Sequence, residues 1–125
     1  MPPPPHEAWT FLPVGYLLTV AIELPILLIG LSARHPLRDR LVAGLWLTAC
    51  TYPVVVLVLP YVIWAPLGRP AYLAVAETFA PAAECGLFWV AYGSRTERFR
   101  WGMFRDFAAI VAANLASFLI GEYLL

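Results

Sequence analysis

Residues 71–93 read AYLAVAETFAPAAECGLFWVAYG, an almost entirely apolar stretch that contains two carboxylic acids, Glu77 and Glu84. The stretch is long enough to cross a hydrocarbon layer of roughly 30 Å as a helix. At about 100° per residue, a seven-residue spacing brings Glu84 back to within about 20° of Glu77. We therefore predict a membrane helix with both acids on one face, roughly 10 Å apart at about 1.5 Å of rise per residue.

Pro81 lies between these two acids and carries no backbone N–H. In a helix it cannot donate to the carbonyl four residues earlier, which belongs to Glu77 itself. One face of this segment is thus expected to offer two carboxyl groups and one backbone oxygen that lacks its helical partner. Such a combination inside an apolar segment indicates a candidate site.

The rest of the chain is also strongly apolar. Of its 125 residues 62% are hydrophobic and only 13% are charged, with a mean hydropathy of +0.76. A soluble domain carries about 25% charged residues and needs polar helix faces, which the apolar stretches here lack. We predict an all-α membrane protein with a single domain, residues 1–125, whose four transmembrane helices form an up-down bundle. The expected spans are about 9–31, 41–64, 71–93 and 103–125.

The distribution of arginine predicts the orientation. The first connection carries three arginines and the third carries four when Arg105, in the first turns of the next helix, is counted, whereas the middle one has only Arg69 and the N-terminal arm has none. By the positive-inside rule, the first and third loops are cytoplasmic and both termini lie on the outer, periplasmic side. All eight basic residues are Arg, a bias that fits a bacterial genome rich in G and C. We expect a multi-pass protein of the bacterial inner membrane, whose arginines contact lipid headgroups rather than nucleic acid.

The N-terminal arm, residues 1–7, contains four consecutive prolines. It is expected to be a short polyproline II segment with no core to join. No basic residue precedes the first apolar run and no small-residue cleavage site follows it, so we do not expect a signal peptide.

A third acid, Glu23, lies near the middle of the first span. An acidic residue at the centre of a membrane helix costs about 2.5–3.5 kcal/mol on insertion scales, so three acids are expensive. We expect Glu23, Glu77 and Glu84 to face the bundle interior or a wet cavity, because lipid offers them no partner. They are the candidate cation-binding or proton-carrying residues.

Polar residues on the second and fourth spans reach a similar depth. Thr51 and Asn114 lie near the expected midplane, and Ser117 follows Asn114 by three residues. An amide at the midplane needs a hydrogen-bonding partner, as does a carboxyl group. We predict that Thr51, Asn114 and Ser117 are supporting polar residues of the site.

The spans contain no Lys, Arg or His near these acids, so an internal salt bridge is not expected. Two alternatives stay open. The carboxyls are protonated and hydrogen-bonded within the bundle, or a cation from solution supplies the charge. For a metal ion, Glu77 and Glu84 are the candidate ligands, and oxygen ligands favour a hard cation over zinc or copper. Cys50 and Cys85 are isolated and are expected to be free thiols.

Prolines also interrupt the second span. Pro53 and Pro60 leave the carbonyls of Ala49 and Val56 without their helical donors. We expect this helix to be kinked or locally opened.

Small residues recur every four positions in the fourth span, at Ala113, Ser117 and Gly121. Such a stripe lets a neighbouring membrane helix approach closely. We therefore expect close packing along this side of the fourth helix.

The ordered pattern resembles a group of small, functionally uncharacterised bacterial four-helix membrane proteins. Its elements are an acid in helix one, T-x-P in helix two, two acids seven apart in helix three, and N-x-x-S-F-x-x-G in helix four. Here these are Glu23, Thr51-Tyr52-Pro53, Glu77 with Glu84-Cys85-Gly86, and Asn114 to Gly121. The resemblance spans nearly the whole chain. It implies the fold and the topology, and it implies no activity.

Two functions remain open at this point. The first is an intramembrane acidic site that binds or transports a cation, a proton or a metal ion, with a homo-oligomer or a partner membrane subunit expected because four helices enclose little space. The alternative is an accessory or structural subunit of a larger membrane complex, with protonated, hydrogen-bonded carboxyls. We do not expect an enzyme, since the spacing of Ser, Cys and His matches no hydrolytic arrangement.

Overall fold

The computed structural model describes residues 2–31, 35–92 and 100–124, except for the side chains of residues 92, 100–103 and 122–124. Within these ranges the chain is helical and contains no strand, and four helical segments are long and apolar enough to cross a membrane. The all-α prediction with four candidate spans is therefore confirmed. The spans are Pro5–Gly30, Leu37–Leu67, Arg69–Ala91 and Phe104–Gly121.

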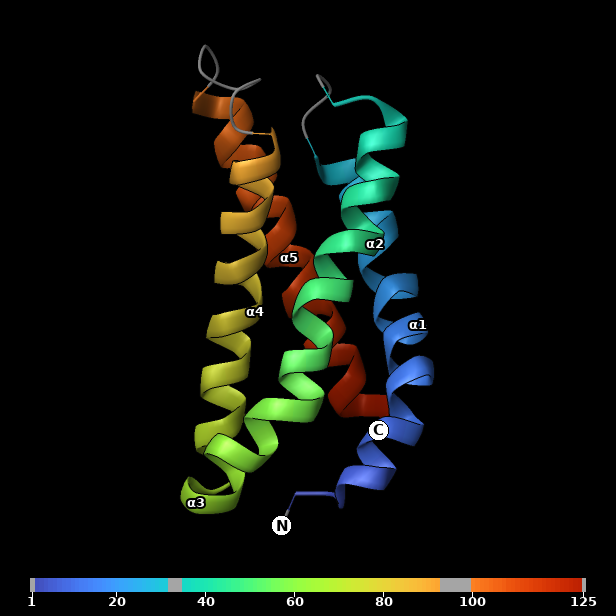
Figure 1. Ribbon diagram of the computed structural model, residues 1–125. Helices are drawn as coiled ribbons and strands as arrows, with labels where there is room; N and C mark the ends of the chain where they lie inside the picture. Colours follow the sequence, from blue (N-terminus) through green and yellow to red (C-terminus); the bar gives the residue numbers. More distant parts are fainter. Residues whose placement is uncertain (1, 32–34, 93–99, 125) are drawn as a thin grey trace.

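The helices run alternately up and down and pack as a bundle (Figure 1). Helix α1 packs against α2 and α5, while α4 packs against α5 and against the second span. The start of α1, the short helix α3 and the end of α5 lie toward one end of the bundle, which we call the α3 end (Figure 1). The end of α1, the start of α2, the end of α4 and the start of α5 lie at the other end, which we call the basic end (Figure 1). The long helices are α1 (Pro5–Gly30), α2 (Leu37–Pro53), α4 (Arg69–Tyr92) and α5 (Arg100–Leu124).

The second span changes its winding after Pro53. Two π-helical stretches follow, in which the N–H of Leu59 donates to Val54 and that of Ala65 donates to Pro60, each five residues back. The two prolines have no backbone N–H to donate. The wider π-helix, which pairs each N–H with the carbonyl five residues back, accommodates the gaps that they leave in the hydrogen-bonding pattern. The expected local opening of the second span thus consists of two π-helical stretches. The complete order is α2 (Leu37–Pro53), η1 (Val54–Val58), η2 (Pro60–Trp64) and α3 (Ala65–Leu67).

A glycine turns the chain from α3 into α4. Gly68 has φ +96°, a left-handed conformation that side chains with a Cβ rarely adopt. Its N–H donates to the carbonyl of Trp64 at 2.8 Å, which closes the end of the second span. The second and third spans are thus joined by a tight turn.

The apolar core lies in the half of the bundle nearer the basic end. Its buried members come from all four long helices, whereas large apolar side chains elsewhere point outward, as Ile29 and Val90 do with 78% of their surface exposed. This distribution suits a lipid environment, in which outward-facing apolar groups are not penalised. The core consists of Leu27, Leu31, Ala43, Leu47, Phe88, Ala109, Ile110 and Ala113.

Two arginines cap the last turn of α1 at the basic end. Arg40 Nη1 donates to the carbonyl of Leu28 at 2.7 Å, and Arg105 Nε donates to that of Gly30 at 2.9 Å. The final carbonyls of a helix lack intrahelical donors and carry partial negative charge, so the guanidinium groups stabilise this end. The contacts also fasten α2 and α5 to α1. Of the other arginines of the first and third connections, Arg34, Arg95 and Arg98 lie outside the described residues.

The N-terminal arm departs in part from expectation, because its last residues are helical and one of its carbonyls contacts the second span. Helix α1 begins at Pro5, and Ala8 in its first turn is only 2% exposed. The carbonyl of Pro3 accepts a hydrogen bond from Tyr61 Oη at 2.8 Å. The prediction of a polyproline II arm was therefore wrong from Pro5 onward, where α1 begins, whereas Pro4 keeps polyproline II angles, with φ −60° and ψ 150°.

The small-residue stripe of α5 is only partly a packing surface. Ala113 is buried in the core, but a Cβ added to Gly121 would meet nothing within 4 Å. A close approach between α1 and α5 lies elsewhere, at Gly30, where an added Cβ would stand 2.8 Å from the Cβ of Ala109. The stripe therefore predicts the packing of Ala113 correctly, but it does not predict the close contact of α1 with α5 at Gly30 and Ala109.

We predict that Gly30→Ala lowers the thermal stability of the purified protein in detergent. The added methyl group overlaps Ala109, whose Cβ cannot move without its helix, and overpacking of this kind costs about 1–3 kcal/mol. Gly86→Ala is the matched control, because its Cβ would meet nothing within 4 Å. Replacing a helical glycine there gains up to about 1 kcal/mol. Equal melting temperatures for the two variants would contradict the contact.

Candidate functional site

Glu23 lies in the middle of α1 with its side chain turned into the bundle, 2% exposed. Thr48 Oγ1 on α2 donates to its Oε1 at 3.3 Å, and Ser117 Oγ on α5 lies 2.5 Å from its Oε2. The carboxyl group thus joins three helices.

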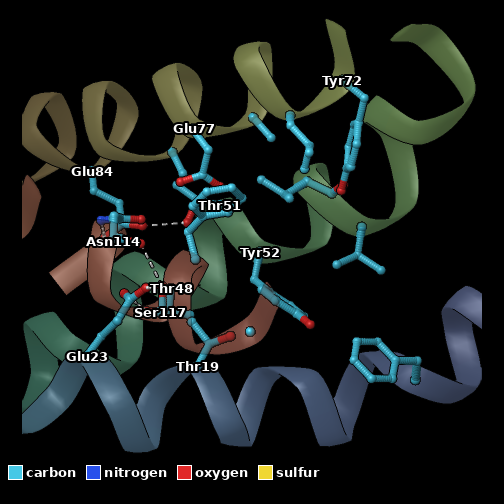
Figure 2. A pocket seen from close by; sticks show the side chains of 18 of the residues that line it. Thr19, Glu23, Thr48, Thr51, Tyr52, Tyr72, Glu77, Glu84, Asn114 and Ser117 are labelled. Carbon is cyan, nitrogen blue, oxygen red and sulfur yellow. Dashed lines mark hydrogen bonds between the residues drawn. The ribbon is translucent and has the colours of Figure 1, made fainter. Parts of the chain in front are cut away.

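Glu84 on α4 is held in the same way and is also 2% exposed. Thr51 Oγ1 donates to its Oε2 at 2.8 Å, and Asn114 Nδ2 donates to its Oε1 at 3.2 Å. The partners of the two glutamates are three residues apart on α2 and three apart on α5, so each pair shares a helix face. Figure 2 shows the two carboxyls and their partners gathered between the helices.

The hydrogen atoms around Glu84 can be counted. The amide of Asn114 donates to the carbonyl of Ile110 at 2.9 Å as well as to Glu84, so both of its N–H groups are used and Oε1 is always an acceptor. Thr51 Oγ1 lies 3.1 Å from the carbonyl of Leu47 in addition to Glu84 Oε2, but a hydroxyl has one hydrogen. If Thr51 donates to Leu47, Oε2 can carry a proton and donate to Thr51. Both protonation states of Glu84 are therefore hydrogen-bonded.

Ser117 gives Glu23 the same choice. Its hydroxyl lies 3.0 Å from the carbonyl of Asn114 and 2.5 Å from Glu23 Oε2. When the hydroxyl donates to the carboxylate, Glu23 is ionised, and when it donates to the backbone, Glu23 can be the donor. We call Thr51 and Ser117 the switching hydroxyls.

A cavity of about 590 Å³ lies beside these groups. Glu23, Glu77 and Glu84 all line it, and Glu77 is half-buried. The two acids of the opening stretch thus face one space. The cavity extends to the α3 end, where the exposed residues Pro3 and Arg69 line it, so it is not enclosed.

A layer of apolar side chains closes the other side of the site. One helical turn toward the basic end from Glu23, Glu84, Asn114 and Thr51 lie Leu27, Phe88, Ile110 and Leu47, each 0–1% exposed. Because one residue comes from each long helix, the layer spans the bundle. The layer therefore separates the cavity and the two glutamates from the basic end of the bundle.

Beyond this layer lies a polar pair that the sequence did not reveal. His35 Nε2 and Asp106 Oδ2 are 2.8 Å apart, and their side chains are 1% and 0% exposed. The ring of His35 meets that of Phe88 edge-on, with centroids 5.2 Å apart. The sequence offered a histidine in a connection and an acid in the first turns of a helix, 71 residues apart, and no spacing links them.

Thr48 is a second residue that the sequence analysis did not assign to the site. It lies three residues before Thr51, so the helical period places both hydroxyls on one face. That signal was available once Glu23 and Glu84 were placed at the same depth.

Within the described ranges, no three His, Cys, Asp or Glu side chains are grouped closely enough to hold a metal ion. Cys50 and Cys85 are free thiols. Comparisons of the chain with protein-family models, curated proteins and solved structures find no match.

We predict that Thr51→Val destabilises the protein by about 1–3 kcal/mol, because it removes the hydroxyl that bonds a buried carboxyl. Thr51→Ser is the control, since it keeps the hydroxyl and should retain most of the stability. Chemical unfolding in mixed micelles measures the difference. Similar losses in both variants would show that the methyl group matters and the hydroxyl does not.

We also predict that His35→Leu destabilises the protein by about 3–5 kcal/mol, because it removes a hydrogen bond from a fully buried carboxyl group. The double variant His35→Leu with Asp106→Leu should recover part of this loss, since no carboxyl is then buried there. Chemical unfolding in mixed micelles measures the stability of the single and the double variant. A double variant less stable than the single one would argue against the pairing as the source of the effect.

Proposed function

We propose that this protein takes up and releases protons at Glu84 and Glu23, through a cavity open to one side of a membrane. One observation carries the proposal. Each glutamate faces a switching hydroxyl that also faces a backbone carbonyl, so the site can hold a proton or lose it without leaving a buried group unsatisfied. A permanently protonated or permanently ionised carboxyl needs only one of these arrangements.

The same geometry favours the proton over a metal ion. A hard cation takes six or more oxygen ligands. The oxygens of Glu84 already accept hydrogen bonds from Thr51 and Asn114, and a metal ion would displace these donors. The alternative in which Glu77 and Glu84 bind a metal ion remains an outcome of the test below.

The proposal includes the setting of the protein. The arginine-rich connections would lie in the cytoplasm of a bacterium, with both termini and the cavity on the outer side of the inner membrane. The structure then corresponds to an outward-open state, and transport across the membrane requires the layer around Leu27, Leu47, Phe88 and Ile110 to part. A second copy of the chain, or a partner subunit, would provide the surface on which such a movement takes place.

A second function has an observation in its favour. The hydrogen bonds of Glu23 and Glu84 tie all four long helices together, which is what a purely structural role would require. Under this alternative the protein is an accessory subunit of a larger membrane complex. Its carboxyls would stay protonated over the whole pH range in which the fold survives.

Infrared difference spectroscopy of the purified protein separates these functions. We predict a carbonyl stretch from protonated, buried carboxyl groups that grows as the pH is lowered and is reduced in Glu84→Gln. Glu7→Gln is the control, because Glu7 is an exposed acid in the first turn of α1. Glutamine keeps the acceptor that Asn114 needs, so the variant should fold.

A band that Glu84→Gln removes but that does not change with pH would favour the structural role. Loss of the band on addition of Mg²⁺, Ca²⁺ or Mn²⁺ at constant pH would favour the metal ion. The expected result is a pH-dependent band that is indifferent to these ions.

A further inference from the structure

The cavity is much larger than a proton site requires. Its volume of about 590 Å³ falls within the range of roughly 300–1,000 Å³ found for small-molecule sites, whereas a water molecule occupies about 30 Å³. Aromatic side chains from α1, the second span, α4 and α5 line it together with the carboxyls. These are Phe11, Tyr52, Trp64, Tyr72 and Phe118.

The aromatic wall nearest the α3 end is held in place. The rings of Trp64 and Tyr72 are stacked, with centroids 5.3 Å apart and planes inclined by 22°. Tyr72 Oη donates to the carbonyl of Val55 at 3.0 Å, which fixes the outer ring edge against the π-helical stretch. A wall that is ordered without a ligand loses little entropy when one binds.

This wall already meets a cation. The guanidinium carbon of Arg69 lies 6.0 Å from the centroid of the Trp64 ring, at the limit of a cation–π contact. Arg69 is exposed and belongs to the outer end of the cavity. Further in, the charged groups that line the cavity are the three carboxyls Glu77, Glu84 and Glu23.

Carboxyls and aromatic faces occur at successive depths along α4. Tyr72 is nearest the α3 end, Glu77 follows, and Glu84 is two turns deeper (Figure 2). Each carboxylate offers about four lone-pair positions, and the hydrogen bonds from Thr51 and Asn114 occupy two of those on Glu84. The inner part of the cavity can thus accept a positive charge, and its outer part can cover apolar groups.

We propose that the cavity binds a monovalent organic ammonium ion with apolar or aromatic substituents, its charge facing Glu77 and Glu84 and its substituents against Trp64, Tyr72 and Tyr52. Aromatic faces attract such cations, and the low dielectric of the bundle strengthens the attraction to a carboxylate. This inference rests on the proposed proton site, since Glu84 takes part in both. Binding breaks one carboxyl O–H bond, the proton leaves to water in the cavity, and the carboxylate pairs with the ammonium ion. The charge within the site stays the same, which avoids the cost of burying an additional charge.

Benzyltrimethylammonium is a suitable probe because it carries a fixed charge, one aromatic ring and no dissociable proton. We expect calorimetric titration of the protein in detergent micelles to show saturable binding that micelles without protein lack. In weakly buffered solution, binding should acidify the medium, and the protons can come only from the protein. Glu77→Gln should weaken binding at least about tenfold, and Trp64→Leu by about fivefold.

Matched variants control for the loss of a charge and of an indole. Glu7→Gln removes an exposed acid of α1, and Trp89→Leu removes an indole that is 57% exposed and does not line the cavity. Both should bind the probe as the unmodified protein does. The melting temperature of each variant, measured without the probe, shows that the fold is retained.

Absence of saturable binding above the empty micelles would overturn the inference, as would equal affinity in Glu77→Gln and the unmodified protein. The infrared band of Glu84 is measured without any probe, so it tests the proton site separately. A pH-dependent band without probe binding would leave the proposed function standing and remove only the ligand class. Probe binding without proton release would contradict the exchange step that links the two.

Discussion

The structure depends on the cost of keeping a carboxyl group out of water. A buried carboxyl must be hydrogen-bonded, and in a membrane helix its partners have to come from neighbouring helices. Glu23 draws on Thr48 and Ser117, and Glu84 on Thr51 and Asn114, so α2 and α5 supply one partner to each acid. The apolar surfaces of these helices would pack equally well against lipid. These four contacts therefore specify how the helices are arranged, because sliding one helix past another would separate a buried acid from its donor.

Much of the fold follows from the sequence because hydrophobic length is a strong signal. The four spans, the turn at Gly68 and the shared face of Glu77 and Glu84 need only local rules of helix geometry. The pairing of donors with acids does not follow, because Thr48 and Thr51 lie on one face of α2 and the sequence does not say which acid each meets. The His35–Asp106 pair is harder to predict, since it joins a residue of the first connection to a residue in the first turns of α5, 71 positions later in the sequence. The contact of the N-terminal prolines could not be predicted for a related reason, because Tyr61, which donates a hydrogen bond to the carbonyl of Pro3, is distant in sequence.

The π-helical part of the second span links the acidic site to the cavity. Val55, Val56 and Trp64 belong to the two π-helical stretches and line the cavity, and the carbonyl of Val55 accepts the hydrogen bond of Tyr72. The prolines that open this helix thus have a consequence beyond the backbone. They accompany the change from a bundle that is packed at the basic end to one that is hollow at the α3 end. Gly121, which leaves open space on α5, contributes to the same change.

The apolar layer between the glutamates and the His35–Asp106 pair has an electrical consequence. In a membrane, a water-accessible cavity brings the potential of one aqueous phase close to the site, so most of the transmembrane voltage falls across the dry layer. Moving one elementary charge through the whole potential changes its energy by about 2.3 kcal/mol per 100 mV. A charge that enters the cavity as far as Glu84 would cross little of this field, whereas a charge that passed Phe88 and Leu47 would cross nearly all of it. The layer of four side chains would thus serve as the insulating part of the molecule.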